Sequence, residues 1–280
     1  MLDQIIANLK NIEITDKPLL DSIFAMYPPI ISDLTFSTIY AWGEYNLFCY
    51  INEHLFIGKI KNNNYYLYQP LGPNAIEIMT NLTSIKWVNV PAIMADCVLS
   101  DQSKYLVRDL FDYVYLRQNM VNMNGPKMGC FRRHVKQCKK LYSITVCVLD
   151  RSLIGQCIAM NERWLASRNL KKNDADYNAL IRSLNNYEYL GLFGLVFIID
   201  DVVEGFRIGE TLNKNTHVSH FAKNNSKYRG LGEYMLHILA NTLNSEIVYI
   251  NLEQDIGNIG LRNHKQKMCP IKMIEKYNYV

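Results

Sequence analysis

The chain has 280 residues, of which 49% are hydrophobic and 20% are charged. This composition supplies enough apolar residues to bury one large core or two ordinary ones, and it excludes a chain that is disordered throughout. The formal net charge is only +4, so the overall charge gives no reason to expect a nucleic-acid partner.

Seven cysteines are scattered along the sequence without a CxxC pair, and Cys130 and Cys138 are too far apart for a metal knuckle. We therefore expect reduced thiols in a cytoplasmic protein and no metal site. The longest apolar run covers residues 190–199, which is much shorter than the roughly 20 residues of a membrane-spanning helix. No transmembrane segment or signal peptide is expected, and any membrane contact would be peripheral.

Aromatic and β-branched residues with polar punctuation predict three short strands within residues 47–68, with turns at Asn52-Glu53 and Asn62-Asn63-Asn64. A helix is predicted over 73–82 and an apolar strand over 87–94. Residues 103–115 fit a helix and a strand equally well. The clearest breaker cluster is 122–129, and a basic helix is expected after it, at 131–141.

The second half repeats this broad order of strands and helices. The predicted elements are a strand at 143–149, helices at 153–167 and 174–187, strands at 192–199, 202–210 and 216–222, a helix at 231–243 and a strand at 247–251. A strand meander flanked by helices thus occurs twice. The predicted class is α+β, with two tandem α/β domains of mixed sheets and flanking helices, at residues 1–125 and 126–280.

The sharpest local motif is Lys227-Tyr228-Arg229-Gly230-Leu231-Gly232, which follows a predicted strand and opens a helix. Glycines allow close approach of the backbone to a ligand, and amides at a helix N-terminus attract anions. The spacing resembles the acyl-CoA pyrophosphate loop of the GNAT acetyltransferases, although Lys227 stands where that family has Gln or Arg. An ordinary glycine-rich turn is the alternative interpretation.

A longer series of residues follows towards the C-terminus. It comprises Tyr249-Ile250-Asn251-Leu252-Glu253-Gln254-Asp255-Ile256-Gly257, then Gly260-Leu261-Arg262, Lys265, Pro270 and Glu275-Lys276-Tyr277. This series resembles the signature of the phosphatidylglycerol lysyltransferase C-terminal-domain family, and weaker matches such as Leu34-Thr35-Phe36 lie in the N-terminal half. The resemblance implies a tandem GNAT-like fold. Characterised members of that family move an aminoacyl group from aminoacyl-tRNA to a lipid headgroup.

Acyl transfer needs a base for the attacking group and a cation or amide for the developing oxyanion. The predicted catalytic carboxylates are Glu210, Glu253 and Asp255, and capping is the alternative role for Asp255. Glu210 is the preferred base because no cation is adjacent to it in the sequence. The predicted donor-binding residues are Lys223, Lys227, Tyr228, Arg229, Gly230, Gly232, Asn251, Arg262 and Lys265. Glu253, Asp255, Arg262 and Lys265 are expected to converge on one pocket.

Basic residues cluster before and within the predicted helix at 131–141. Lys127, Arg132, Arg133 and Lys136 are predicted to form an anion surface for tRNA or an anionic headgroup, and a solvated face is the alternative. His217 and His220 are three apart on a predicted strand, so they are expected to face opposite sides and to be core or solvent positions.

Two positions depart from the family pattern, because Ala222 replaces a carboxylate and Leu252 replaces an arginine. Two functions therefore stay open. The first is an acyltransferase that uses aminoacyl-tRNA or acyl-CoA as donor and a small molecule or lipid headgroup as acceptor. The second is a non-catalytic binding module that keeps the fold and the anion-binding surface. Neither implies a tightly bound cofactor, and the sequence does not define the oligomeric state.

Overall fold

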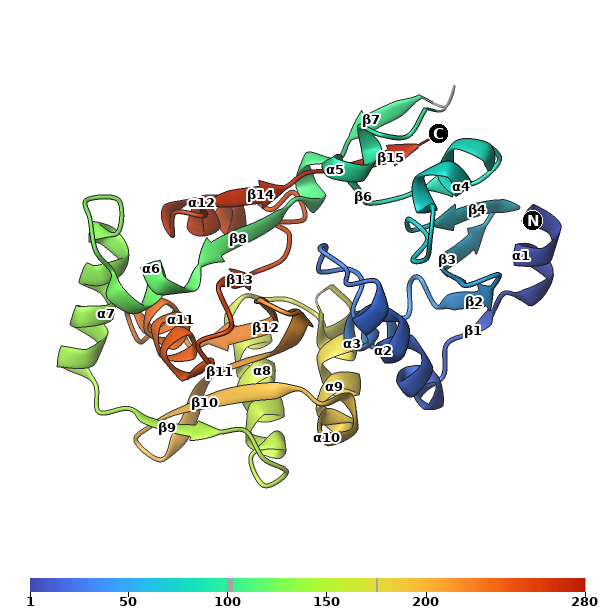
Figure 1. The fold of residues 1–280 in the computed structure, drawn as a ribbon. Coiled ribbons are helices and arrows are strands. Elements are labelled where there is room, and N and C mark those ends of the chain that lie inside the picture. The colour runs from blue at the N-terminus through green and yellow to red at the C-terminus, as the bar shows by residue number, and fades with distance from the viewer. Residues whose placement is uncertain (100–102, 175, 280) are drawn as a thin grey trace. The chain divides into compact units, whose positions relative to one another are not determined.

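The computed structural model describes residues 1–99, 103–174 and 176–279, which form two compact units (Figure 1). Unit 1 comprises Met1–Asp112, Gln254–Asn258 and Met273–Val280, and unit 2 comprises Tyr113–Glu253 and Ile259–Lys272. The first boundary differs from the predicted one at 125/126, because the breaker cluster at 122–129 lies inside unit 2. Unit 1 also recruits two later segments of the chain.

Unit 1 contains a five-stranded sheet of order β1-β2-β3-β4-β5. The strands are β1 (Lys10–Asn11), β2 (Leu47–Ile51), β3 (His54–Lys61), β4 (Asn64–Leu67) and β5 (Lys86–Trp87). Neighbours are antiparallel except β4 and β5, which are parallel and are connected through α4 (Ala75–Asn81). Asn52-Glu53 and Asn62-Asn63 have the positive φ angles of tight two-residue hairpin turns, which confirms the predicted meander.

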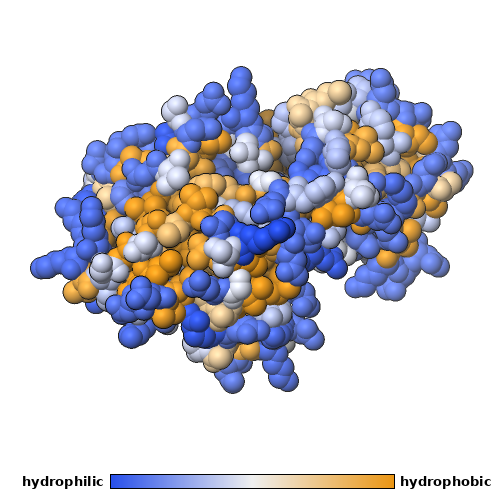
Figure 2. Space-filling view, turned by 90° about the horizontal axis from the view of Figure 1, so that it is seen from below, coloured by the Kyte–Doolittle hydropathy of each residue, from blue (hydrophilic) through white to orange (hydrophobic). Residues whose placement is uncertain are grey.

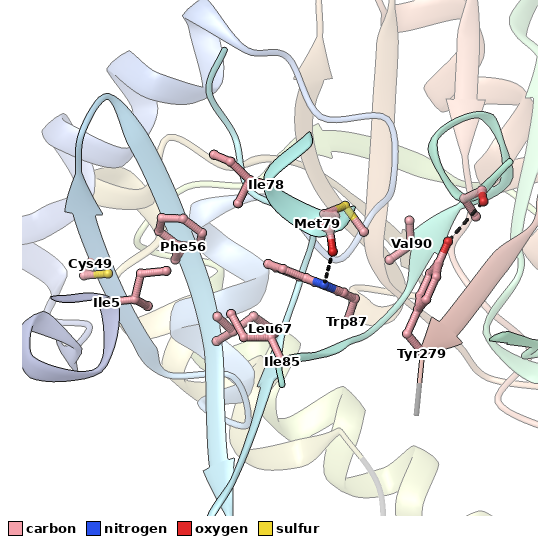
Figure 3. Close-up of a cluster of buried hydrophobic side chains, with 11 residues drawn as sticks. Ile5, Cys49, Phe56, Leu67, Ile78, Met79, Ile85, Trp87, Val90 and Tyr279 are labelled. Atoms are coloured by element: carbon pink, nitrogen blue, oxygen red, sulfur yellow. Dashed lines mark hydrogen bonds between the residues drawn. The ribbon is translucent and has the colours of Figure 1, made fainter. Parts of the chain in front are cut away.

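The core of unit 1 joins residues that are far apart in the sequence (Figure 3). The buried indole of Trp87 donates a hydrogen bond to the carbonyl of Met79 at 3.3 Å. Tyr279 belongs to the same cluster, and its hydroxyl donates to the carbonyl of Ala95 at 3.0 Å. Residues near the C-terminus therefore complete the core of the N-terminal unit.

A second, three-stranded sheet of unit 1 has the order β6-β15-β7. Its strands are β6 (Val90–Pro91), β15 (Lys276–Tyr279) and β7 (Lys104–Leu106), and the remaining helices are α1 (Leu2–Asn8), η1 (Ile14–Asp16), α2 (Lys17–Met26), α3 (Phe36–Trp42), α5 (Ala92–Ala95) and η2 (Arg108–Leu110). The predicted strand over 87–94 is wrong at its end, because Ala92 begins α5. The ambiguous segment 103–115 contains β7, η2 and most of β8.

Unit 2 is built on a seven-stranded sheet of order β14-β8-β13-β12-β11-β10-β9. Its strands are β8 (Asp112–Leu116), β9 (Thr145–Val148), β10 (Phe193–Ile199), β11 (Val202–Asn213), β12 (Thr216–Asn224), β13 (Tyr249–Asn251) and β14 (Lys272–Ile274). Strands β9 to β12 form an antiparallel meander, and β12 is parallel to β13 through α11 (Leu231–Thr242). Each unit thus ends its meander in a parallel β-α-β step, and the predicted α+β class is confirmed.

Helices cover both faces of this sheet. They are α6 (Arg117–Asn122), α7 (Gly129–Leu141), α8 (Ile154–Ser167), η3 (Lys172–Asp174), α9 (Tyr177–Asn185), α10 (Tyr187–Leu190), α11 and α12 (Ile259–Lys267). A Cβ atom on Gly205 would meet Met235 of α11, whereas Lys223, which pairs with Phe206, lies over Trp164 of α8. Successive strand residues point to opposite faces, so α8 and α11 lie on opposite sides. Residue 175, in the predicted helix at 174–187, lies outside the described residues.

Some apolar side chains remain at the surface of unit 2. Figure 2 shows apolar residues over much of the face that is seen from below, among hydrophilic ones. Leu141, Val148 and Val202 are exposed large hydrophobic residues of this unit. Within residues 1–99, 103–174 and 176–279, no helix has both the length and the apolar character needed to cross a bilayer.

Candidate active site

A β-bulge in β12 places a histidine where the strand would otherwise continue its regular pairing. Opposite β11, Ile208 pairs with Phe221 and Gly209 pairs with Ser219, so His220 is the extra residue between them. A bulge of this kind redirects a side chain and is common beside active sites. His220 is the centre of the candidate site.

The neighbouring strands β12 and β13 are paired over a short stretch only. The parallel register runs from Thr216 opposite Tyr249 to Val218 opposite Asn251. Beyond this point β12 continues to Asn224, while β13 ends at Asn251. His220 and Glu253 follow the last paired residues of the two strands, so they meet where these strands separate.

Two carboxylates hold the imidazole of His220. Its Nδ1 atom lies 2.8 Å from Oε1 of Glu253, and its Nε2 atom lies 2.9 Å from Oε1 of Glu210 on β11. The His220 side chain is 4% exposed, against 13% for Glu210 and 19% for Glu253. The imidazole is therefore shielded from solvent, whereas the two carboxylates are partly accessible to it.

The charge state of this cluster follows from its geometry. Burial alone would lower the pKa of His220, but the hydrogen bonds and charges of Glu210 and Glu253 outweigh burial and raise this pKa to about 10. His220 is therefore an imidazolium at neutral pH, and both ring nitrogens donate. No cation is adjacent to Glu210 in the sequence, but in the folded chain His220 of the neighbouring strand lies beside it.

The backbone around Glu253 is also unusual. Its φ angle is +58°, in the left-handed region that non-glycine residues avoid at a cost of about 1–2 kcal/mol. The amide of Glu253 donates to Oδ1 of the buried Asn251 at 2.8 Å, and its carbonyl accepts from the amide of Tyr113 at 3.1 Å. Asn251, a predicted donor-binding residue, therefore orients Glu253. Strain held in place by such contacts is typical of functional positions.

Asp255, the third predicted catalytic carboxylate, lies in unit 1 and not in this cluster. Its fully buried carboxylate pairs with Arg108 at 3.1 Å and accepts from the amide of Gly257 at 3.0 Å. The ion pair with Arg108 and the bond to the turn before α12 are structural contacts of Asp255. Because Asp255 belongs to unit 1 and Glu253 to unit 2, the expected convergence of the two carboxylates stays a prediction.

Of the two predicted cations on α12, Lys265 bonds to the backbone next to Glu253. Its buried Nζ atom donates to the carbonyl of Leu252 at 2.5 Å, immediately before Glu253. Arg262 is half-buried on the same helix. Leu252 itself is buried, and Ala222 is exposed. The two departures from the family pattern therefore leave the Glu210–His220–Glu253 cluster complete.

Lys223 on β12 lies on the same face of the sheet as Glu210 on β11 and is already paired. Its Nζ atom lies 2.8 Å from Asp176 and 3.8 Å from the ring centroid of Trp164. Burial lowers the pKa of Lys223, although the charge of Asp176 opposes this effect. Along β12, Lys223 follows His220 by three residues and forms an ion pair with Asp176.

The glycine motif opens α11 as predicted, with Gly230 at the N-cap and φ = +82°. However, a Cβ atom on Gly230 would lie 2.4 Å from the backbone oxygen of His134 in α7. Because Gly230 has no side chain, the backbone of α7 can lie directly against it. Lys227 and Arg229 are exposed, while Tyr228 is buried and packs edge-on against Tyr142. Gly232 follows in the first turn of the helix.

The predicted anion surface comprises Lys127, which precedes α7, and three residues within α7, and these residues have different surroundings. Lys127, Arg133 and Lys136 are exposed. Arg132 is half-buried, and its guanidinium donates to the carbonyls of Met123 at 2.5 Å and Gly125 at 3.3 Å. Arg132 therefore stabilises the preceding loop, and the exposed part of the predicted anion surface is smaller than expected.

Three members of the site escaped sequence reasoning: His220, Asp176 and Trp164. In the sequence, His217 and His220 raise only the question of whether they share a metal ion. The described residues contain no group of His, Cys, Asp or Glu arranged to hold a metal ion. A useful signal was the acid Glu210 on a strand directly before the histidine-bearing strand, since antiparallel neighbours bring such residues together.

The two compact units with their mixed sheets define the fold class of this protein as α+β. The chain belongs to the family "Phosphatidylglycerol lysyltransferase, C-terminal", whose model matches residues 24–280. No curated protein matches the sequence.

Three solved structures share the fold. A conserved protein of unknown function from Bacteroides thetaiotaomicron has a TM-score of 0.89 and 23% identity, and the match covers 97% of this chain and 98% of that one. L-PGS from Bacillus licheniformis has a TM-score of 0.66 and 12% identity, with 94% and 91% covered. FemX has a TM-score of 0.63 and 10% identity, with 97% of each chain covered. At these identities the likeness establishes the fold alone.

Proposed function

We propose that this protein transfers an aminoacyl group from aminoacyl-tRNA to an amine or hydroxyl of a small molecule or lipid headgroup. The Glu210–His220–Glu253 cluster is the observation that carries the proposal. It places two carboxylates and a charged imidazole where two parallel strands separate. The family description names a lysyltransferase, which supports an aminoacyl donor over an acyl-CoA donor.

In the proposed reaction the acceptor atom forms a bond to the carbonyl carbon of the ester, and the bond from that carbon to the tRNA oxygen breaks. The acceptor loses one proton, and the tRNA hydroxyl gains one. Glu210 is the proposed base because only its Oε1 atom is bonded to His220, which leaves Oε2 to accept the proton. His220 is a positioning residue, since it fixes both carboxylates and balances their charge.

The donor would be held by cations at the surface of unit 2. Arg133 and Lys136 on α7 are exposed and three residues apart, so they lie on one side of the helix. Phosphate contacts of this kind give sequence-independent affinity for a nucleic acid. Lys127 and Arg229 are further exposed cations that suit the same role.

An aminoacyl-transfer assay tests the proposal. Purified protein is incubated with radiolabelled aminoacyl-tRNA and a set of amine, hydroxyl and lipid acceptors, with acetyl-CoA as the alternative donor. The Glu210→Gln variant is expected to lose about 10²-fold or more in turnover, which is the usual contribution of a general base. Glu246→Gln, at an exposed glutamate of the same unit, is the matched control and is expected to be fully active.

The outcomes separate the two functions that the sequence leaves open. Donor-dependent turnover that Glu210→Gln abolishes and Glu246→Gln preserves supports the enzyme. Binding of aminoacyl-tRNA without turnover for any acceptor supports the binding module. Equal turnover in the two variants removes Glu210 from the mechanism.

A further inference from the structure

Arg207 on β11 is a buried cation without an acidic partner among the described residues. It is 7% exposed, and its Nη1 atom donates to the hydroxyl of Ser219 at 3.0 Å. Its Nε atom is buried without a hydrogen-bond partner. The other buried cations of unit 2 are treated differently: Lys223 pairs with Asp176, and Lys265 donates to the carbonyl of Leu252. The Nε–Nη2 edge of Arg207 is thus open within the described part of the chain.

A second unsatisfied group lies beside this guanidinium. His217 is 2% exposed, and its Nε2 atom is buried without a hydrogen-bond partner. Burial first, and then the charges of His220 and Arg207, lower the pKa of His217 to about 3, so its ring is neutral. A Cβ atom on Gly209 would lie 2.8 Å from this Nε2 atom. The glycine opposite therefore makes room for the imidazole.

Arg207 and His217 share the α11 face of the sheet. Thr211 pairs with His217 in the register of β11 and β12, and positions 207, 209 and 211 of a strand point to one side. Glu210 points to the other side, and His220 bonds to it. The expected opposite orientation of the two histidines is confirmed. The Arg207 group is thus distinct from the proposed catalytic cluster.

An unpaired guanidinium in a protein interior is strongly unfavourable, because it has lost its hydration and gained no counter-charge. Burial lowers the pKa of Arg207 to about 10, so the group still carries its charge at neutral pH. Replacement by an apolar residue would normally be more stable than an isolated buried charge. A bound anion removes this penalty, since the open edge of a guanidinium accepts an oxyanion through two parallel hydrogen bonds.

We propose that Arg207, His217 and Ser219 form a binding site for a singly charged oxyanion, either a carboxylate or a phosphodiester of a small ligand. One positive charge matches one negative charge. The Nε–Nη2 edge binds two oxygen atoms of the anion, and the neutral imidazole donates from Nε2. This site does not depend on the proposed transfer activity.

A cavity of about 380 Å³ lies on the same side of the sheet, which is the size range of small-molecule sites. Its walls come from α7, α11 and α12, and His134, Glu233, His264 and Lys267 are among its lining residues. His264 also interacts electrostatically with Arg207. The remainder of the ligand is therefore expected to occupy this cavity.

Thermal unfolding of the full chain tests the site. Sodium acetate is the carboxylate probe and sodium dimethyl phosphate is the phosphodiester probe, each exchanged for chloride at constant ionic strength. A saturable rise in Tm with either probe is expected for the wild type, and the responding probe identifies the ligand chemistry. Arg207→Met is expected to raise the half-saturating concentration about tenfold or more, the usual effect of losing charge-assisted hydrogen bonds. Without anion, its Tm is expected to equal or exceed that of the wild type.

The matched control is Arg163→Gln, because Arg163 already donates to the carbonyl of Val203 at 2.6 Å and lies near Glu204. This variant is expected to keep the full anion response. A wild type that responds to neither probe, or an Arg207→Met variant that responds like the wild type, overturns the proposal. If Arg207→Met does not fold, wild-type crystals soaked in dimethylarsinate decide: an anomalous arsenic peak beside Arg207 supports the site, and its absence there refutes it.

Discussion

Glu210 on β11 and Glu253, which lies two residues beyond the end of β13, bind the two nitrogens of one imidazole, that of His220. Two acids this close would repel each other without a cation between them. The bulge in β12 and the left-handed backbone of Glu253 are the local distortions that make the arrangement possible. Neither distortion is encoded in a simple alternation pattern, which explains why the cluster is clear only in the folded chain.

Substitution of His220 tests its role as a positioning residue. The His220→Asn variant removes the charge between the two carboxylates, so the acids repel and their geometry loosens. We expect turnover to fall by about 10–10²-fold and the pH–rate profile to move, since each macroscopic pKa belongs to the cluster. The pH–rate profile separates this effect from a general loss of packing, which would lower the rate without moving the profile.

The raised pKa of His220 also predicts a pH dependence of stability. Its pKa is about 10 in the folded protein, against an ordinary value of 6.5 for an imidazole, so the folded state binds the proton more tightly. The stabilisation is complete below about pH 6.5 and is lost as the pH rises through about 10. Urea unfolding between pH 6 and 10 should show a decline on the order of 4 kcal/mol that His220→Asn lacks. Identical slopes for the two proteins would contradict the assignment of charge.

Substitution at Gly230 is expected to act on folding and not primarily on donor binding. A side chain at this position would meet the backbone of His134, and the φ angle of +82° disfavours any L-residue. Gly230→Ala should therefore lower the free energy of unfolding by about 2–4 kcal/mol. Gly232→Ala is the control, since its Cβ would touch only the side chain of Asn224 at 3.3 Å and alanine favours the helix. Equal stability of the two variants would show that the packing against α7 is unimportant.

A buried ionic network in unit 1 makes a further prediction. Lys276 is fully buried, donates to Asp112 at 2.6 Å and also pairs with Asp33. Lys276→Ala leaves the buried carboxylate of Asp112 and the half-buried carboxylate of Asp33 without their cation, and we expect a loss of about 3–5 kcal/mol of stability. Lys10→Ala breaks the exposed Lys10–Asp16 pair and should cost less than about 1 kcal/mol. Chemical denaturation of both variants gives the comparison directly.

The anion surface of α7 can be measured through salt dependence. If Arg133 and Lys136 contact tRNA phosphates, the double variant Arg133→Gln/Lys136→Gln should flatten the slope of log K against log salt by about two units. Arg132→Gln should leave the slope unchanged, because that guanidinium bonds the loop carbonyls. If the double variant leaves the slope unchanged, these residues do not contact tRNA, and the surface is only a solvated face of the helix.

The sequence was sufficient to predict the α+β fold class and most helices and strands of unit 2. The meander of β9 to β12 and the helix α11 follow alternation and periodicity that depend on local residues. Glu253, Gln254 and Asp255 look like one motif in the sequence, whereas the chain enters unit 1 between the first two. Gln254 donates to Asp112 at 3.0 Å and is structural. Such a change of unit within a motif depends on tertiary packing and leaves no local signal.

Arg207 is a second residue whose role depends on tertiary packing and is not evident from the sequence. Its sequence context, Gly205-Phe206-Arg207-Ile208-Gly209, looks like an ordinary strand with one outward cation. Only the covering helix reveals that this side of the strand is interior. The two glycines on the same face were the available sign that something else must approach the backbone there.

The incorporation of β15 into unit 1 has a consequence for synthesis on the ribosome. Tyr279 fills part of a core that otherwise consists of residues up to Ala95, and β15 completes the sheet between β6 and β7. The N-terminal unit, although translated first, therefore cannot close its core until residue 279 has left the exit tunnel. Its apolar side chains stay exposed while the remainder of the chain is made, and unfinished cores of this kind are what chaperones bind. Unit 1 is therefore expected to fold only after β15 has been made, and not vectorially from its N-terminus.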